Sequence, residues 1–343
     1  MKNLFFLMII CFLIGSLNAC VASATLPEEP EEGILFQSDR DGSVRFYLLS
    51  KTKEETVELT FPDLPVDSKI EGFSWSSKTE KWFFSLTNEL GNDVYSFDVN
   101  GQNIKKITDT PMVTKAPLAV SPDGMQISFV GYSLGADILI VESTGDDYTN
   151  LTPYKSTDHY PVWTPDNKHI VFRSDYNGLP NIYMIDIDGK NLTNISNGPG
   201  VDGLFSVSSD GSRIVFDSDR EGSRDLFVAN LGEDSYVNIT KHPARDIDPK
   251  WSPDSQYVLF KSDRDGGEDL YLLKLSDNSV IRLTNSPDNG ELNPIWCLDS
   301  QCIIFNANLN GQQDIFQVNL DGSIVNLTNS PANEYSPQIW SEY

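Results

Sequence analysis

The feature that most constrains the fold of this 343-residue chain is a sequence unit that returns every 43 to 45 residues. Its clearest copy is "WSPDSQYVLFKSDRDG" at residues 251–266. Seven positions correspond to its first residue; they are Trp75, Val120, Trp163, Val207, Trp251, Trp296 and Trp340. A fixed period of this length is typical of solenoids and propellers, because a single unit cannot bury its own apolar surface and needs neighbours to cover it.

Each unit contains four short segments with strand character. A turn such as "SPDG" or "TPDN" follows the marker position, and Pro and Asp favour tight turns. Next come an apolar triplet such as "IVF", a polar loop such as "SDRDG", a second apolar run such as "DLYLL", and a closing "NLT" or "NIT". Capped stretches of helical periodicity are missing from the sequence. Four antiparallel strands per unit predict a propeller blade.

The two ends of the chain hold complementary parts of one unit. The segment "GILFQSDRDG" at residues 33–42 matches residues 257–266 but has no Trp-type segment before it, whereas "PQIWSEY" at residues 337–343 is a surplus one. We therefore expect an all-β fold: a seven-bladed β-propeller of four-stranded antiparallel blades over residues 33–343, with the first blade closed by the C-terminal strand. Closure of this kind removes the free sheet edges of an open array.

The N-terminal 19 residues are predicted to be a signal peptide. Lys2 precedes an apolar run at residues 4–14, which is too short to span a bilayer. The sequence "LNAC" resembles a bacterial lipobox and predicts lipidation of Cys20, with cleavage after "ASA" at residues 22–24 as the alternative. Residues 20–32 form the predicted lipidated Cys and disordered acidic tether. The expected location is the periplasm or the cell surface, with the membrane contacted through the lipid anchor alone.

Composition limits the partners. The chain has 50 acidic and 25 basic residues and a formal charge of −25, so it repels phosphate backbones and anionic lipid surfaces. We therefore exclude nucleic acid as a partner. The charge is explained by solubility, and cation binding or a basic protein partner is the alternative.

Four cysteines are present, and two of them lie in the predicted mature domain. Cys297 and Cys302 flank four residues that are predicted to form a hairpin loop, so a disulfide across this hairpin is expected in an oxidising compartment. A pair of free thiols is the alternative. The spacing is a weak signal for a metal site.

The pattern of these units resembles the propeller repeats of TolB-like (WD40-like) periplasmic proteins. Residues 161–189 and 251–273 carry the resemblance most clearly, and it extends over residues 33–343. It implies a propeller and does not specify an activity, because unrelated functions share this fold. Two features differ from TolB: no room is left for its N-terminal α/β domain, and TolB-like propellers usually have six blades where we count seven.

Three patterns that suggest chemistry have simpler interpretations. The motif "GYSLG" contains Ser133 in a G-x-S-x-G pattern, but a strand follows it where a hydrolase has a helix. His159, His169 and His242 are scattered, unlike the His-rich metal sites of the seven-bladed oligogalacturonate lyases. Acidic loops such as residues 263–269 suit turn capping, with Ca²⁺ binding as the alternative. We expect no catalytic residue, no metal and no cofactor.

Ligand binding is expected on the variable loops that lead into the Trp-type strands, around one mouth of the central channel. The candidate residues are Lys115, Asp158, His159, Tyr160, Arg245, Asp246, Asp248, Glu291, Glu334 and Tyr335. The predicted function is that of a monomeric, non-enzymatic cell-envelope lipoprotein that binds an envelope protein or a cell-wall component over this face. The alternative is a carbohydrate-binding or lyase-like propeller with a metal in the channel.

Overall fold

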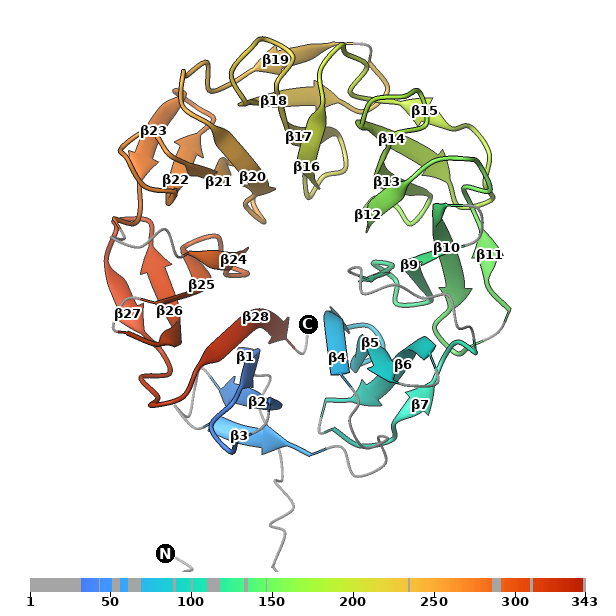
Figure 1. Cartoon of the computed structure of the whole chain (residues 1–343), viewed down its shortest axis with the longest axis vertical. Coiled ribbons are helices and arrows are strands. Elements are labelled where there is room, and N and C mark those ends of the chain that lie inside the picture. The colour runs from blue at the N-terminus through green and yellow to red at the C-terminus, as the bar shows by residue number, and fades with distance from the viewer. Residues whose placement is uncertain are drawn as a thin grey trace, which may run out of the picture.

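The computed structural model of the chain describes residues 32–42, 44–50, 56–60, 69–88, 91–99, 101–109, 118–132, 135–145, 147–233, 235–285, 291–308 and 311–341. In these residues, 28 strands form seven four-stranded antiparallel sheets, arranged as the blades of a ring (Figure 1). The predicted seven-bladed β-propeller is confirmed. Nothing in the described part of the chain forms a helix that is long and apolar enough to cross a bilayer.

The blades are numbered in chain order, and their strands are given from the channel outward. Blade 1 consists of β28 (Glu334–Ser341), β1 (Glu32–Ser38), β2 (Arg45–Ser50) and β3 (Thr56–Leu59), and blade 2 of β4 (Lys69–Ser76), β5 (Lys81–Asn88), β6 (Gly91–Asp98) and β7 (Lys105–Lys106). Blade 3 consists of β8 (Ala119–Val120), β9 (Gln126–Tyr132), β10 (Ala136–Glu142) and β11 (Thr149–Asn150), and blade 4 of β12 (Asp158–Trp163), β13 (His169–Ser174), β14 (Asn181–Asp186) and β15 (Thr193–Asn194).

The remaining three blades follow the same order. Blade 5 consists of β16 (Asp202–Val207), β17 (Arg213–Ser218), β18 (Asp225–Asn230) and β19 (Tyr236–Asn238), and blade 6 of β20 (Asp246–Trp251), β21 (Tyr257–Ser262), β22 (Asp269–Lys274) and β23 (Ser279–Arg282). Blade 7 consists of β24 (Leu292–Trp296), β25 (Cys302–Asn308), β26 (Gln313–Asn319) and β27 (Ile324–Asn326).

The apolar core lies between neighbouring blades. Between blades 4 and 5, for example, Val171 and Ile182 pack in one buried cluster with Phe216 and Phe227. The two middle strands of a blade are covered on both faces in this way, which is why their apolar residues run consecutively instead of alternating with polar ones. The sequence repeat therefore reflects packing, since each blade must offer similar apolar side chains to two neighbours.

The ring closes where the two ends of the chain meet. β28 pairs antiparallel with β1 and brings Ile339 opposite Ile34 (Figure 1). In blades 4 and 6 the marker Trp has this place: Trp163 lies opposite Ile170, and Trp251 opposite Val258. The expected equivalence of Trp340 with Trp251 is therefore wrong by one residue, because Trp340 stands three positions after its Pro whereas Trp163 and Trp251 stand two positions after theirs.

A recurring arginine fixes the start of the inner strand in three blades. In blade 6, Arg264 of the "SDRDG" loop donates two hydrogen bonds of 2.9 Å to the buried carboxylate of Asp246. Its guanidinium also lies over the rings of Phe260 and Tyr271. The same arrangement joins Arg220 to Asp202 and Arg40 to Glu334. These acidic positions therefore hold the inner strand against its own blade.

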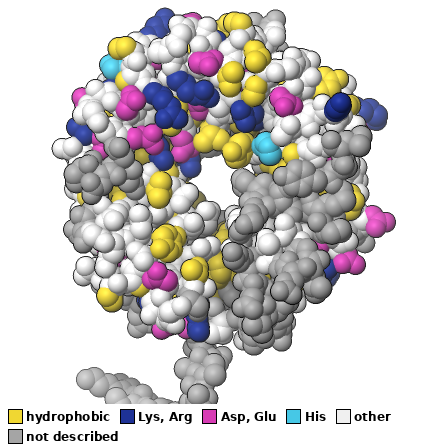
Figure 2. Space-filling model, viewed as in Figure 1, with side chains coloured by type: hydrophobic (Ala, Val, Ile, Leu, Met, Phe, Trp, Pro, Cys, Tyr) yellow, Lys and Arg dark blue, Asp and Glu magenta, His cyan; other side chains and the backbone are white. Residues whose placement is uncertain are grey.

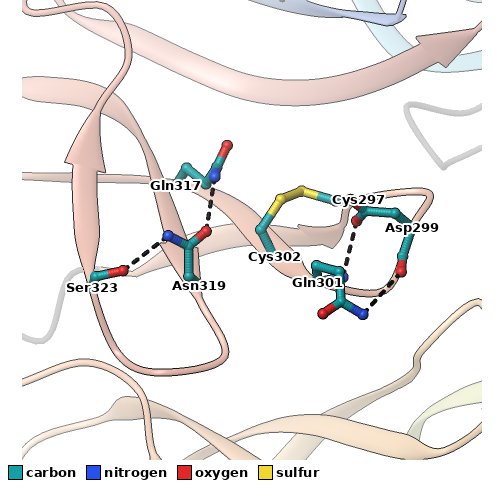
Figure 3. The surroundings of a disulfide bond; sticks show 7 residues. All are labelled: Cys297, Asp299, Gln301, Cys302, Gln317, Asn319 and Ser323. Carbon is teal, nitrogen blue, oxygen red and sulfur yellow. Dashed lines mark hydrogen bonds between the residues drawn. A yellow bond between two sulfur atoms is a disulfide. The ribbon is translucent and has the colours of Figure 1, made fainter.

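The structure contains a disulfide between Cys297 and Cys302, with a Cα–Cα distance of 5.2 Å (Figure 3). In blade 6 the place of Cys297 is taken by Ser252, whose hydroxyl donates to Asp254 and accepts from the Tyr257 backbone N–H. The covalent link in blade 7 thus replaces a hydroxyl-capped turn. It lies at the contact with the closing blade, since both cysteines share a buried cluster with Ile34 and Phe36.

Candidate functional site

The inner strands begin at one mouth of the channel, and this is the region where the sequence predicts ligand binding. Four acidic candidates there, Asp158, Asp246, Glu291 and Glu334, are at most 3% exposed. Asp246 and Glu334 are held by arginines, and Asp158 accepts hydrogen bonds from Ser174 and Ser156. The carboxylates of Asp158, Asp246 and Glu334 therefore serve the scaffold, and burial closes all four carboxylates to a ligand.

A pocket of about 340 Å³ opens at this mouth over blades 4, 5 and 6. Three of the predicted residues line it, Tyr160, Arg245 and Asp248, together with six others: Arg173, Gly203, Leu204, Asp217, Arg224 and Ile247. Figure 2 shows Lys and Arg side chains gathered beside the channel on this face, with apolar side chains next to them. The pocket thus combines three guanidinium groups with an aromatic ring on an otherwise acidic protein.

The floor of the pocket is the ion pair of Asp217 and Arg224. The Arg224 Nε donates to Asp217 Oδ2 over 2.5 Å, and the other carboxylate oxygen accepts from the Leu204 backbone N–H over 2.9 Å. Burial raises the pKa of the Asp217 carboxyl, and the neighbouring Arg224 charge opposes this rise. The pair therefore fixes the guanidinium in place, and among the described residues its hydrogen bond is made by Nε.

Gly203 provides the space for this pair. A Cβ atom on Gly203 would collide with Asp217 Oδ2 and with Arg224 Nη2. The corresponding residues in the inner strands of blades 4 and 6 are His159 and Ile247, which both carry side chains. The next two positions also differ, because Leu204 and Phe205 stand where blades 4 and 6 have a left-handed residue followed by Pro, as at Tyr160 (φ 58°) and Asp248 (φ 52°). The missing side chain at Gly203 opens the pocket wall.

Arg173 differs from the residues at its place in the next three blades. There, the residue after the Phe of the second strand interacts with the residue seven positions on: Asp217 with Arg224, Lys261 with Glu268, and Asn306 with Gln313. In blade 4 this partner position is Pro180, which has no side-chain acceptor. Arg173 instead donates from Nε to the backbone oxygen of Asp202 in blade 5, over 2.8 Å.

Arg245 and Tyr160 form the exposed edge of the pocket. The Arg245 side chain is 57% exposed and lies 3.6 Å from the Glu268 carboxylate, a distance of weak attraction. Its backbone N–H donates to Asp263 Oδ1, which fixes the loop that carries it. Tyr160 is 38% exposed and lies against the half-buried His159 ring. Burial lowers the pKa of His159, and the Arg173 charge lowers it further.

Other predicted residues do not join this pocket. Tyr335 is half-buried in blade 1, where burial raises the pKa of its hydroxyl, with a smaller effect of Asp39. Lys115, Cys20 and Ser133 lie outside the described residues.

Potential metal ligands come together at one place in the described part of the chain. Cys297, Asp299 and Cys302 have ligand atoms within 4.8 Å of one another. Both sulfur atoms are used in the disulfide and are not thiolates, the form in which cysteine binds metals. His169 and His242 lie elsewhere: the first is near Asp186, and the second accepts from the Ala244 N–H.

Sequence reasoning missed Arg173, Asp217 and Arg224. The signal was present at the residue that follows the Phe of each second strand, because this position varies while its surroundings repeat: Gln37, Ser85, Val130, Arg173, Asp217, Lys261 and Asn306. Variation within a constant frame is typical of a surface adapted for binding, since the scaffold itself does not require it.

Seven four-stranded blades closed into a ring define a β-propeller, and a pocket lined by three arginines opens at one mouth of its channel. The family model described as the TolB β-propeller domain matches residues 70–201 and 193–341. The chain therefore belongs to the TolB β-propeller family, as the repeat pattern indicated.

Individual relatives are distant. A TolB homologue of Chlorobaculum tepidum is 27% identical over 99 residues, which are 29% of this chain and 23% of the length of that relative. The crystal structure of TolB from Acinetobacter baumannii has a TM-score of 0.57 and 18% identity, covering 86% of this chain and 78% of the other. An oligogalacturonate lyase from Vibrio parahaemolyticus has a TM-score of 0.69 and 16% identity, covering 84% and 86%. At these identities the structural likeness shows the fold alone.

Proposed function

We propose that this protein is a non-enzymatic cell-envelope lipoprotein that binds a partner protein at the mouth of its propeller channel. The observation that carries the proposal is the pocket lined by Arg173, Arg224, Arg245 and Tyr160. Arginine and tyrosine are enriched at the centres of protein interfaces, because they combine large contact areas with directed hydrogen bonds. The remaining loops of this face would supply the rim.

Two further observations support a place in the envelope. The disulfide at Cys297 and Cys302 suits an oxidising compartment, since cytosolic proteins keep their thiols reduced. The apolar run and the Cys20 motif at the start of the sequence suit export and lipid attachment. In this proposal the lipid holds the protein on a membrane while the propeller remains free to contact a partner.

Site-specific photo-crosslinking tests the proposal. A benzophenone amino acid in place of Tyr160 should capture a discrete partner in intact cells, because Tyr160 lies at the pocket edge. The matched control is the same replacement at Met125, which is 60% exposed at the turn between β8 and β9, the opposite end of the strands. Equal capture at both positions, or none at Tyr160, would contradict the proposal.

The anchor is tested separately. Cys20→Ser should move the protein from the membrane fraction to the soluble fraction of lysed cells, because a single lipid is the proposed attachment. Persistent membrane association of this variant would argue for another form of attachment.

A second candidate function is the binding of an acidic carbohydrate. It is favoured by the pocket volume of about 340 Å³, which suits a small ring, and by the arginines that line the pocket. A glycan array with acidic and neutral oligosaccharides would test it, together with metal analysis of the purified protein. Selective binding of acidic glycans without protein capture at Tyr160 would favour this function over the first.

A further inference from the structure

The cationic pocket has a specific chemistry that the binding role alone does not require. Within the described residues, the hydrogen bonds of the Arg173 and Arg224 guanidinium groups are both made by Nε, to the Asp202 carbonyl and to the Asp217 carboxylate. Their Nη nitrogens are therefore available as donors. Both groups are already oriented, so a ligand would bind them at little further entropic cost.

The charged residues that line the pocket suit a ligand that carries one negative charge. Three arginines and two aspartates, Asp217 and Asp248, line the pocket, which leaves an excess of one positive charge when both acids are ionised. Glu268 beside Arg245 does not change this excess, because Lys261 lies 3.8 Å from the same carboxylate and balances its charge. A single carboxylate would neutralise this excess, whereas a phosphate ester at neutral pH would exceed it. The planar fork of arginine also matches the two oxygens of a carboxylate.

The surroundings of the pocket favour a polypeptide as the source of this carboxylate. Tyr160 is 38% exposed at its edge, and Leu292, at the start of the inner strand of blade 7, is 44% exposed on the same mouth. Exposed aromatic and apolar side chains beside arginines are typical of protein interfaces. The rest of this protein is strongly acidic, with a net charge of −25, so a broadly acidic partner would be repelled.

We propose that the pocket of Arg173, Arg224 and Arg245 binds one Asp or Glu side chain of the partner, presented by a segment that is otherwise neutral or basic. This inference rests on the proposed protein-binding function and adds the chemistry of the contact. The surrounding negative charge then acts against wrong partners, since only a segment with an isolated carboxylate would reach the pocket without repulsion.

The direct test is a titration with three peptides of one length that differ at a central residue: Glu, Gln or phosphoserine in a Gly/Ser background. The Nε–H resonances of Arg173 and Arg224 report binding in ¹H–¹⁵N spectra, and galacturonate serves as the carbohydrate probe. We expect the Glu peptide to shift both resonances and the Gln peptide to shift neither. Equal binding of Glu and Gln peptides, no shift up to tens of millimolar, or tighter binding of phosphoserine or galacturonate would overturn the inference.

Two variants assign the effect to the pocket. Arg173→Gln should weaken the Glu peptide by at least about tenfold, because a charge-assisted hydrogen bond is lost. Lys168→Gln is the matched control: it removes one positive charge from the same blade, at the exposed turn between β12 and β13, away from the mouth. Equal affinities of the two variants would contradict the inference.

Arg224 needs a paired change, because Arg224→Gln alone would leave the buried Asp217 without its countercharge. The double variant Asp217→Asn and Arg224→Gln removes both charges together. It should keep the near-ultraviolet circular dichroism of the folded protein and lose affinity for the Glu peptide. A folded double variant with unchanged affinity would exclude Arg224 from the site and overturn the three-arginine assignment.

The outcomes separate this inference from the function on which it rests. If Arg173→Gln leaves the capture of a partner at Tyr160 unchanged, protein binding stands and the carboxylate contact is wrong. If Tyr160 captures nothing while the Glu peptide still binds, the site stands and the protein-binding function is wrong.

Discussion

Gly33 and Trp340, from opposite ends of the chain, are partners across the seam that closes the ring. The indole nitrogen of Trp340 occupies the place where any other residue at position 33 would have its Cβ, and the carbonyl oxygen of Leu49 lies 2.9 Å from the same point. Trp340 is 1% exposed and packs edge-on against Trp75 of blade 2. The absence of a side chain at Gly33 in β1 therefore leaves the space that the Trp340 indole of β28 fills.

Gly33→Ala should lower the free energy of unfolding by roughly 1–3 kcal/mol, because the added methyl group overpacks this seam. The measurement is urea unfolding followed by tryptophan fluorescence. Trp340→Phe removes the atom that the methyl group meets, so the double variant should lose less stability than the two single changes predict together. Simple additivity would show that the two residues do not compete for this space.

Asp246→Asn should destabilise the protein by about 3 kcal/mol, because Arg264, whose side chain is 12% exposed, loses its buried countercharge. Asp158→Asn should cost much less, since Tyr176 stands in blade 4 where blades 1, 5 and 6 have the arginine, and hydroxyl groups surround Asp158. Chemical denaturation of both variants at neutral pH checks this difference. Similar losses would contradict the assigned roles of the two carboxylates.

The burial of Asp158 also predicts that the stability of the protein depends on pH. Burial raises the pKa of Asp158 above its ordinary 3.8, so the folded state holds this proton more tightly than the unfolded state. The favourable effect of protonation is complete below 3.8 and is lost as the pH rises through the folded-state pKa. Wild-type stability relative to Asp158→Asn should therefore fall over this window. A constant difference between the two proteins would contradict the prediction.

Removal of the disulfide should cost roughly 2 kcal/mol, the value expected for closing so short a loop. The variant Cys297→Ser, Cys302→Ala should recover part of this loss relative to Cys297→Ala, Cys302→Ala. Its serine can donate to Asp299, as Ser252 donates to Asp254 in blade 6. Thermal unfolding of both double variants checks the difference. Equal stability of the two double variants would show that a serine at position 297 does not cap this turn as Ser252 caps the turn in blade 6.

Arg173→Gln should raise the pKa of His159 towards its ordinary 6.5 without restoring it fully, because burial is the larger cause of the lowered value. The ¹H resonances of the His159 ring, followed through a pH titration, measure this change, and Lys168→Gln is the control. The folded state holds the His159 proton less tightly, so stability is lost as the pH falls from 6.5 through the folded-state pKa. This loss should be smaller in Arg173→Gln.

The architecture could be predicted because it repeats. The turn after each marker and the two incomplete end units were sufficient to place Ile34 beside the C-terminal strand. The single register error arose at Trp340, where the most recognisable side chain stands one residue beyond the position of its counterparts. The position of Trp340 depends on its contact with Trp75 of blade 2, and the sequence repeat does not predict this contact.

The candidate site was less predictable, because the sequence does not show which side chains at the channel mouth are buried and which are exposed. Asp158 and Asp246 are the first residues of β12 and β20 at the mouth, and both are buried. Arg264 of the next hairpin loop covers Asp246, and Ser174 at the end of β13 donates to Asp158. Arg173 and Arg224 come from second strands and hairpin loops of two blades, and they meet only because the inner strand of blade 5 is narrow at Gly203. The sequence around either arginine does not indicate that the two side chains line one pocket.

The pairing of β28 with β1 also sets an order for folding during synthesis. Blades 2 to 7 can stack as the chain emerges, because each is continuous in sequence. The inner edge of β1 stays open until β28 has left the ribosome, so a chain that lacks β28 carries an exposed template for misassembly. Loss of β28 by premature termination or proteolytic trimming would therefore leave the inner edge of β1 unpaired and open the ring.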